Sequence, residues 1–279
     1  MVHLKALKFI FLIFLIFLIS LTSGCIDAGS FNEGFVSDRV NKLLPKGAVS
    51  VEDLEAGEVN ATGNRESNVS PVSREIPAVP TFSEEKSHAV YPKEYRLISL
   101  NFQRAIGSGE EKIAEEVFNI TGKTSGYDIE DACDVFNHVN KRWQYRYDKN
   151  AEFFFGSAQT INSGYTGDCD DYSIVMSALL KNMGFNTRVV TAYNESYGHA
   201  YPELYIGDDN ETAYKILSYI AERYSSAENV WYSERVLEDG KTQYWLNFDW
   251  SGSNGYRHPG GEYFRGSCVI YYPNGLVEF

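Results

Sequence analysis

Apolar residues in the middle of the chain recur at the spacing of amphipathic helices. In residues 110–120 and 128–143 they return every three or four positions, and the second set comprises Ile129, Ala132, Val135, Phe136, Val139 and Trp143. A third segment of this kind begins at Asp168 and stops at Gly184, a residue type that commonly follows the last turn of a helix. The pattern predicts three helices that each bury one face.

The periodicity changes after the third helix. Residues 187–193, 199–206, 243–250 and 267–272 are rich in β-branched and aromatic side chains, as strands are, whereas residues 211–224 return to helical spacing. The stretch 156–167 is rich in Gly, Ser and Thr, so we expect a loop there. Helices that come first and strands that follow favour an α+β fold with an antiparallel sheet.

The N-terminal third of the chain has a different character. Lys5 and Lys8 precede an apolar run at residues 9–19, and small residues then lead to Cys25, which is the order of a secretory signal peptide. The run is shorter than the roughly 20 residues of a membrane-spanning helix, so an uncleaved anchor is the weaker interpretation. Residues 25–90 are rich in Gly, Ser, Asn, Glu and Pro, and we expect a flexible tether followed by a domain at 91–279 that folds alone.

The segment before Cys25 also resembles a lipidation signal. LTSGC, residues 21–25, is similar to the lipobox of secreted lipoproteins, although Thr22 stands where such boxes usually carry leucine. The resemblance implies cleavage after residue 24 and a lipid on Cys25, so we expect an exported protein held on the outer face of the cell membrane.

Composition and charge narrow the class of function. Hydrophobic residues make up 43% of the chain, with 20 Tyr and 17 Phe, which is enough for a packed core. The formal net charge of -13 repels phosphate backbones, and the chain has no Lys/Arg cluster or zinc-finger spacing. Nucleic acid is therefore a poor candidate for a partner.

Cys169 stands where a helix can activate a thiol. With Asp168 as N-cap and Asp171 at the third helical position, Cys169 is the first residue of the third helix, whose backbone N–H groups stabilise a thiolate. The charges of Asp168 and Asp170 favour the neutral thiol, so a nucleophile here requires a nearby histidine. Among the five histidines, His199 is favoured because it opens a predicted strand directly after a glycine.

Asp249 is the candidate partner of this histidine. Strand alternation places it on one face with Trp245 and Asn247, and an aspartate between Phe248 and Trp250 is costly to desolvate unless it is paired. Cysteine hydrolases commonly orient their imidazole with such a carboxylate. The expected catalytic set is Cys169, His199 and Asp249.

Taken together, these motifs resemble the transglutaminase-like superfamily, whose core is related to that of papain-like thiol proteases. The resemblance spans residues 128–250 and is carried by GDCDDYS before an apolar helix, GHAYPEL, and WLNFDW. It implies a transglutaminase-like, papain-like core, with N-terminal helices and the nucleophile helix packed on an antiparallel sheet. It also implies that Cys169 is the nucleophile, His199 the general base and acid, and Asp249 the orienting carboxylate.

One residue departs from that family pattern, and one catalytic role is left unassigned by it. Pro202 lacks a backbone donor and suggests an edge strand or a bulge at the histidine strand. The oxyanion donor is not assigned, and the candidates are the backbone N–H of Cys169 and the side chains of Gln159, Trp143 and Gln144.

Other interpretations of the same residues stay open at this point. The chain is expected to be a thiol hydrolase that acts on peptide or amide bonds of a protein or peptide substrate. One alternative is an amide-transferring transglutaminase. The other is a catalytically silent binding module for surface proteins or polymers, in which Cys169 is a buried hydrophobic residue. Asp168, Asp170 and Asp171 are expected to cap the helix; because some periplasmic relatives bind calcium near the nucleophile, they are also weak calcium candidates. Cys133 and Cys268 could form a disulfide in an exported protein.

We expect the mature protein to begin at Cys25 and to carry lipid on that residue, because the apolar run is short and ends in small residues. Intact-mass spectrometry of protein recovered from membranes measures this directly. A retained Met1, or a Cys25→Ser variant that is processed and localised like the parent, would contradict the prediction.

Overall fold

The computed structural model describes residues 47–50, 76–82, 91–147, 154–225, 227–237, 239–250 and 257–279. They belong to one unit of the chain, Lys42–Phe279. The predicted signal peptide, Cys25 and most of the predicted tether lie outside the described residues. No helix within the described ranges is both long enough and apolar enough to cross a membrane.

The helices agree closely with the sequence pattern where that pattern is long. They are α4 (Lys93–Ile106), α5 (Glu110–Thr121), α6 (Ile129–Arg142), α7 (Ser157–Asn162), α8 (Cys169–Asn182) and α9 (Asn210–Arg223). The four helices expected at 110–120, 128–143, 168–184 and 211–224 are confirmed as α5, α6, α8 and α9. The loop expected at 156–167 is wrong in part, because α7 forms a short helix there whose six residues are too few to show a helical period.

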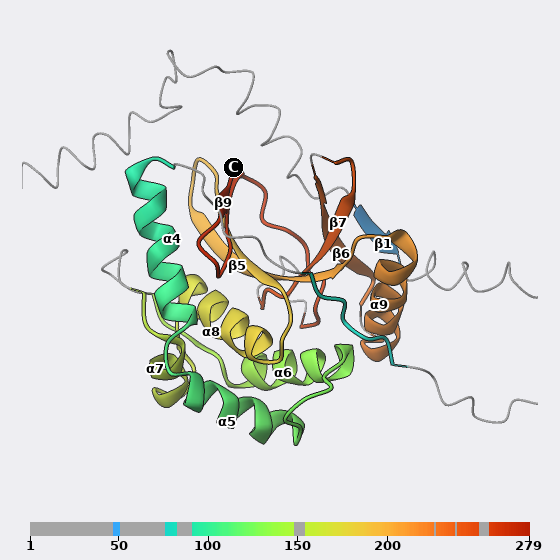
Figure 1. Ribbon diagram of the computed structural model, residues 1–279, viewed down its shortest axis with the longest axis horizontal. Coiled ribbons are helices and arrows are strands. Elements are labelled where there is room, and N and C mark those ends of the chain that lie inside the picture. Colours follow the sequence, from blue (N-terminus) through green and yellow to red (C-terminus); the bar gives the residue numbers. More distant parts are fainter. Residues whose placement is uncertain are drawn as a thin grey trace, which may run out of the picture. The chain divides into compact units, whose positions relative to one another are not determined.

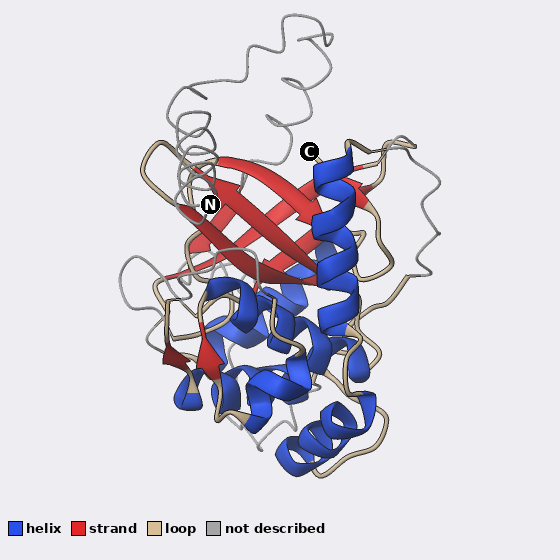
Figure 2. Ribbon diagram, turned by 90° about the vertical axis from the view of Figure 1, so that its left-hand side faces the viewer, coloured by secondary structure: helices blue, strands red, loops and turns tan. Residues whose placement is uncertain are grey.

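The strands build one large antiparallel sheet. Its order is β1-β6-β7-β5-β4-β8-β9, and every neighbouring pair is antiparallel. The strands are β1 (Gly47–Ser50), β4 (Thr187–Tyr193), β5 (Gly198–Gly207), β6 (Asn229–Val236), β7 (Thr242–Asn247), β8 (Ser267–Tyr271) and β9 (Val277–Glu278). A separate parallel pair joins β2 (Gln144–Tyr145) to β3 (Thr166–Gly167). Helices α5 to α8 gather on one side of the sheet (Figures 1 and 2), so the predicted α+β architecture is confirmed.

Helix α8 lies at the centre of the helical layer, beneath β5 (Figure 1). Every residue from Asp171 to Leu180 is buried, including Tyr172, Met176 and Leu179 with no exposed surface. A helix that is buried on all sides must be enclosed by other elements, and here these are α4, α5, α6, α7, β4 and β5. Each fully buried large apolar side chain contributes about 1.5–3 kcal/mol to folding.

The opposite face of the sheet carries a second, aromatic cluster around a buried ion pair. Arg188 Nε donates to Glu203 Oε2 at 2.6 Å, and the Arg188 guanidinium lies 4.0 Å from the centre of the Trp245 ring. Glu203 Oε1 also accepts from Tyr263 and Ser233, at 2.7 and 2.6 Å. Because both ions have several partners, the desolvation cost of burying them is offset, and loss of one ion would cost about 3–5 kcal/mol.

Strand β5 is central rather than peripheral, so the edge position suggested by Pro202 is wrong. β5 lies between β4 and β7, and Pro202 is paired with Val189 of β4. The Pro202 carbonyl accepts from Phe248 N at 2.9 Å, one residue beyond the end of β7. In an antiparallel sheet the backbone N and O of one residue point to the same neighbouring strand, so the nitrogen of Pro202 also faces the β7 side. Because β7 ends at Asn247, this position lies beyond the β5–β7 ladder, and the missing N–H of Pro202 costs no ladder hydrogen bond. The irregularity in this ladder lies between Tyr205 and Gly207 instead.

Cys133 and Cys268 are free, buried thiols, so they do not form the disulfide considered from the sequence. Cys133 belongs to the core beneath the sheet, and Cys268 belongs to the aromatic cluster on the other face. The sheet itself therefore separates the two sulfur atoms. Burial raises the pKa of Cys133 to about 12, which makes this thiol inert at neutral pH.

Two pieces of the segment expected to be a tether contact the domain. β1 pairs with β6, and residues 76–82 run against the sheet. Asn186 holds Phe82 by two hydrogen bonds, accepting from Phe82 N at 2.8 Å and donating to Phe82 O at 3.0 Å. The Phe82 ring packs edge-on against Tyr205 with the centroids 4.9 Å apart, and Val79 is buried. Val79 stands between Ala78 and Pro80, and two prolines in seven residues interrupt any helical or strand period, so the sequence gives no periodic signal here.

We therefore expect a chain that starts at residue 91 to be less stable than one that starts at residue 76. Loss of the buried Val79 and partly buried Phe82 side chains should lower the melting temperature by roughly 5–10 °C, which circular dichroism can measure. Phe82→Ala in the longer chain should reproduce part of the loss. Equal melting temperatures for the two chains would show that residues 76–82 contribute nothing to stability.

Candidate active site

The start of α8 places Cys169 at the positive end of the helix. Asp168 is the N-cap and forms a capping box with Asp171, whose Oδ2 accepts from Asp168 N at 3.3 Å. Asp171 Oδ1 also accepts from Phe155 N at 3.3 Å, so this carboxylate joins the nucleophile helix to the preceding segment. Gly167 is required here, because a Cβ at that position would collide with the Asp171 carboxylate. The predicted capping arrangement is confirmed.

The parallel β2–β3 pair holds the chain just before Cys169. Gln144 N donates to Tyr165 O, and Arg146 N donates to Gly167 O, both at 2.8 Å. Tyr165 has a φ of 61°, which is uncommon for a residue other than glycine. Its side chain is fixed by a 2.6 Å hydrogen bond from the hydroxyl to Glu116 Oε1. The segment that leads to Cys169 is thus fixed both by backbone hydrogen bonds and by the buried Tyr165 side chain.

His199 and Asp249 are directly hydrogen-bonded. His199 Nε2 lies 2.6 Å from Asp249 Oδ2, and both side chains are largely buried. His199 is on β5 directly after Gly198, where a Cβ would lie 2.7 Å from the Tyr193 ring. The imidazole also has aromatic neighbours, with the Phe264 and Tyr201 ring centroids at 5.8 and 6.0 Å.

Asp249 is held two residues beyond the end of β7. Its backbone N donates to Asn247 Oδ1 at 2.8 Å. The adjacent carbonyl of Phe248 accepts from the Tyr172 hydroxyl at 3.2 Å. Because Tyr172 belongs to α8, the helix that carries Cys169 is tied to the segment that carries Asp249.

The charge state of His199 follows from these neighbours. Burial alone lowers the pKa of His199, but the charge and hydrogen bond of Asp249, together with a hydrogen bond to Cys169, outweigh burial and raise the pKa to about 10. The imidazole is therefore protonated at neutral pH. Since Nε2 faces Asp249, the second ring nitrogen, Nδ1, is the one available to the sulfur. The expected set Cys169, His199 and Asp249 is brought together by the structure.

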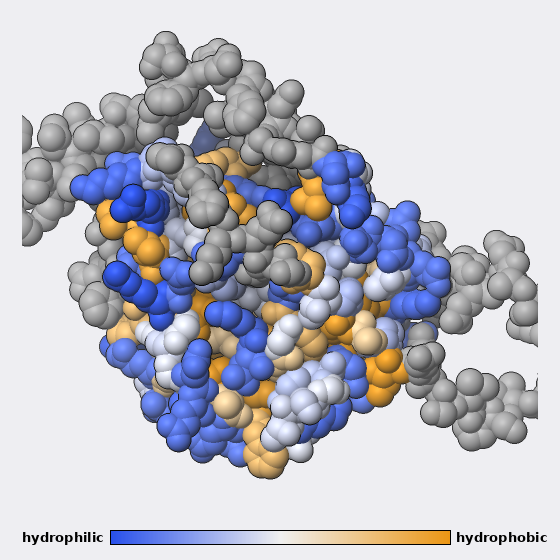
Figure 3. Space-filling view, viewed as in Figure 1, coloured by the Kyte–Doolittle hydropathy of each residue, from blue (hydrophilic) through white to orange (hydrophobic). Residues whose placement is uncertain are grey.

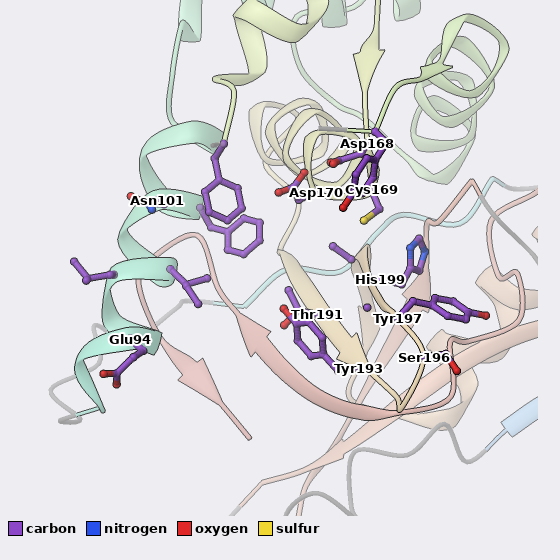
Figure 4. A pocket seen from close by; sticks show the side chains of 17 residues that line it. Glu94, Asn101, Asp168, Cys169, Asp170, Thr191, Tyr193, Ser196, Tyr197 and His199 are labelled. Carbon is purple, nitrogen blue, oxygen red and sulfur yellow. The ribbon is translucent and has the colours of Figure 1, made fainter. Parts of the chain in front are cut away.

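A pocket of about 780 Å³ opens beside the sulfur, between α4 and the β4–β5 hairpin (Figure 4). Cys169 and His199 lie at one end of it. The walls include Leu97, Ile98 and Phe102 from α4 and Tyr193 and Tyr197 from the hairpin. The sequence analysis did not identify α4 as part of the site. Its apolar face, with Phe102, Ala105 and Ile106 buried, is the signal that could have predicted the helix.

The acidic residues around Cys169 have different roles. Burial, followed by the hydrogen bond and charge of Asp168, raises the pKa of Asp170 to about 9, so the Asp168–Asp170 pair shares a proton at neutral pH. Asp168, Asp170 and Asp171 can each offer one oxygen within 4.8 Å of the others. Calcium takes six to eight oxygen ligands, and Asp171 already binds two backbone N–H groups. These residues fit a helix cap better than a calcium site.

The side chains considered as oxyanion donors are not in the pocket wall. Neither Gln159, Trp143 nor Gln144 lines the pocket. Gln159 and Gln144 are exposed. Trp143 packs its ring on Tyr172 at 5.1 Å, and its buried Nε1 has no hydrogen-bond partner among the described residues. The backbone N–H of Cys169 is the remaining candidate and lies at the unsatisfied start of α8.

Two comparisons with known proteins found similarity to this chain. The sequence model of the Transglutaminase-like superfamily matches residues 112–249, a range that contains Cys169, His199 and Asp249. The chain is also similar to the crystal structure of a "Putative Cysteine Protease" from Cytophaga hutchinsonii, with 15% identity and a TM-score of 0.34. That match covers 63% of this chain and 51% of the other, so it spans about half the length of that protein. No curated protein sequence matches the chain. Residues 112–249, just under half of the chain, are therefore similar to the transglutaminase-like superfamily.

Proposed function

We propose that this domain is a thiol hydrolase that cleaves peptide or amide bonds. Cys169 is the nucleophile, His199 the general acid and base, and Asp249 the carboxylate that orients the imidazole. The observation that carries the proposal is that Cys169 and His199 lie together at one end of an open pocket, with His199 hydrogen-bonded to Asp249. A helix N-terminus and an adjacent imidazolium both stabilise a thiolate.

In this proposal the reaction begins from a thiolate–imidazolium pair. The Cys169 sulfur attacks the carbonyl carbon and forms a C–S bond, and the carbonyl oxygen gains the negative charge near the Cys169 backbone N–H. His199 then gives its Nδ1 proton to the leaving amine as the C–N bond breaks, which leaves an acyl-enzyme.

Water completes the cycle. Neutral His199 takes a proton from the attacking water, the C–S bond breaks, and the carboxylic acid product leaves while the thiolate–imidazolium pair is restored. Asp249 fixes the orientation of the ring throughout by the hydrogen bond to Nε2.

The geometry favours water over an amine as the acyl acceptor. Tyr193 and Tyr197, on the hairpin wall of the pocket, are 55% and 65% exposed, so the mouth is open to solvent. Amide transfer requires that water be kept away from the acyl-enzyme. We also propose that the enzyme acts outside the cytoplasm, held by a lipid on Cys25; this part rests on the N-terminal sequence pattern.

We expect iodoacetamide to alkylate Cys169 readily near pH 6, because the imidazolium of His199 favours the thiolate. In His199→Ala, the alkylation rate at that pH should fall about 10-fold or more, since each 1.4 kcal/mol of lost thiolate stabilisation is a factor of ten. Asp249→Asn should have a smaller effect, because that residue acts through the imidazole. Peptide mapping gives the rate for each cysteine.

The buried thiols Cys133 and Cys268 serve as internal controls and should stay unlabelled while the protein is folded. A silent binding module gives the opposite result. If folded protein shows no labelling of Cys169 below pH 8, or the same pH profile after His199→Ala, the catalytic assignment is wrong.

Hydrolysis and amide transfer can be separated by product analysis. We expect a library of glutamine-containing peptides, incubated with a primary amine, to give cleaved or deamidated products, because solvent reaches the pocket mouth. Mass spectrometry distinguishes these products from amine adducts, and Cys169→Ala is the control. Predominant amine adducts would assign the protein to the transferases.

A further inference from the structure

The pocket beside Cys169 is lined by acidic groups without opposing cations. Glu94, Asp168 and Asp170 line it, and none of its described lining residues is lysine or arginine. His199 is positively charged, but that charge faces Asp249 and the sulfur. The field that a substrate meets in the pocket is therefore negative. In a low-dielectric cleft such a field attracts cationic ligands and repels anionic ones.

The acidic groups lie at two separate places along the pocket. Asp168 and Asp170 flank Cys169 at one end, and Glu94 lies at the far end, in the first turn of α4 (Figure 4). Between Glu94 and Phe102 the helix advances by roughly 12 Å, which matches three to four residues of an extended peptide. A bound peptide can thus reach both acidic positions only if it lies along α4.

The wall between these two positions is apolar. Leu97 and Ile98 of α4 face the hairpin that carries Tyr193, and Leu97 is 51% exposed. Hydrophobic groups are visible at the upper left, where α4 lies, and also elsewhere on the same face (Figure 3). Exposed apolar groups that line a cleft are typical of a ligand-binding surface. An apolar substrate side chain is the group that fits against this wall.

We propose that the pocket selects peptides that carry a cationic side chain next to the scissile amide and an apolar side chain beside it. The cation contacts Asp168 and Asp170, and the apolar side chain packs between α4 and Tyr193. This substrate class deepens the proposed hydrolase function and rests on it.

The Asp168–Asp170 pair suits a guanidinium or ammonium group. Since the two carboxyls share a proton, the free pocket holds a single negative charge there without a buried counter-ion. An arriving cation stabilises the second carboxylate, so the proton can leave and the pair can bind a planar guanidinium through two oxygens. Glu94 adds attraction for a second cation about three residues away but is exposed, so its effect should be smaller.

The test compares peptide chloromethyl ketones that alkylate the active-site thiol. Acetyl-Leu-Arg, acetyl-Leu-Gln and acetyl-Leu-Glu chloromethyl ketones are used, because the thiolate displaces chloride and forms a stable thioether, so no acyl-enzyme arises and neither hydrolysis nor amide transfer affects the rate. We expect Cys169 of the full chain to react about 10-fold faster with the Arg probe than with the Gln probe, and slowest with the Glu probe. Acetyl-Ser-Arg chloromethyl ketone should react several-fold more slowly than acetyl-Leu-Arg.

Variants show where the preference arises. Asp170→Asn keeps the shape of the protonated carboxyl but cannot ionise, so the Arg/Gln rate ratio should fall about 5-fold or more. Glu94→Gln should lower the ratio by about 2-fold. Glu211→Gln is the matched control, because Glu211 is also an exposed glutamate in the first turn of a helix but does not line the pocket. It should leave the ratio unchanged in 0.5 M NaCl, where attraction by the overall net charge is screened.

The outcomes separate this inference from the proposed function. If iodoacetamide labels Cys169 near pH 6 but the Arg, Gln and Glu probes react equally, the substrate class is wrong and the hydrolase proposal stands. An Arg preference that Asp170→Asn leaves intact also overturns the inference. If neither iodoacetamide nor any peptide probe labels Cys169, both proposals are wrong.

Discussion

The burial of α8 is the constraint on which the rest of the site depends. This helix is enclosed by other helices and by the sheet along its whole middle part, so its axis and rotation are fixed by packing. Its first residue is Cys169, and its Tyr172 hydroxyl holds the carbonyl of Phe248, next to Asp249. The same packing that supplies the core therefore also sets the sulfur and the distant carboxylate relative to one another.

The three aspartates at the start of α8 have different electrostatic roles. Asp171 binds backbone N–H groups, and Asp170 holds a proton that it shares with Asp168. Fewer negative charges oppose a thiolate than the sequence GDCDDYS suggests. The imidazolium of His199, stabilised by Asp249, faces the remaining charge. The arrangement gives a physical reason why an acidic neighbourhood is compatible with a nucleophilic sulfur.

The sequence was most informative where a pattern extends over several turns or where one residue type has few roles. The bounds of α5, α6, α8 and α9, the capping of α8 and the strand position of His199 follow from periodicity and from capping chemistry, whereas Asp249 lies two residues beyond the end of β7. The family resemblance was confirmed by the match over residues 112–249.

Features that depend on long-range contact could not be read from the sequence in the same way. Helix α7 has only six residues, and the segment 76–82 is held mainly by Asn186, Tyr205 and one buried valine. The central place of β5 was missed, because the effect of Pro202 depends on where β7 ends. The oxyanion candidates Gln159, Trp143 and Gln144 could not be matched to a motif in the sequence, and none of them lines the pocket.

The far face of the sheet supports the histidine through one strand. His199, Tyr201 and Glu203 alternate along β5 and share a face. The Tyr201 ring lies between His199 and Tyr263, at 6.0 and 5.6 Å, and the Tyr263 hydroxyl donates to Glu203, which pairs with Arg188. This buried series fixes the register and depth of β5 at the point where the imidazole must meet Asp249. Because a hydrogen bond of 2.6 Å tolerates little displacement, the ion pair on the far face serves the geometry of the site as well as the stability of the sheet.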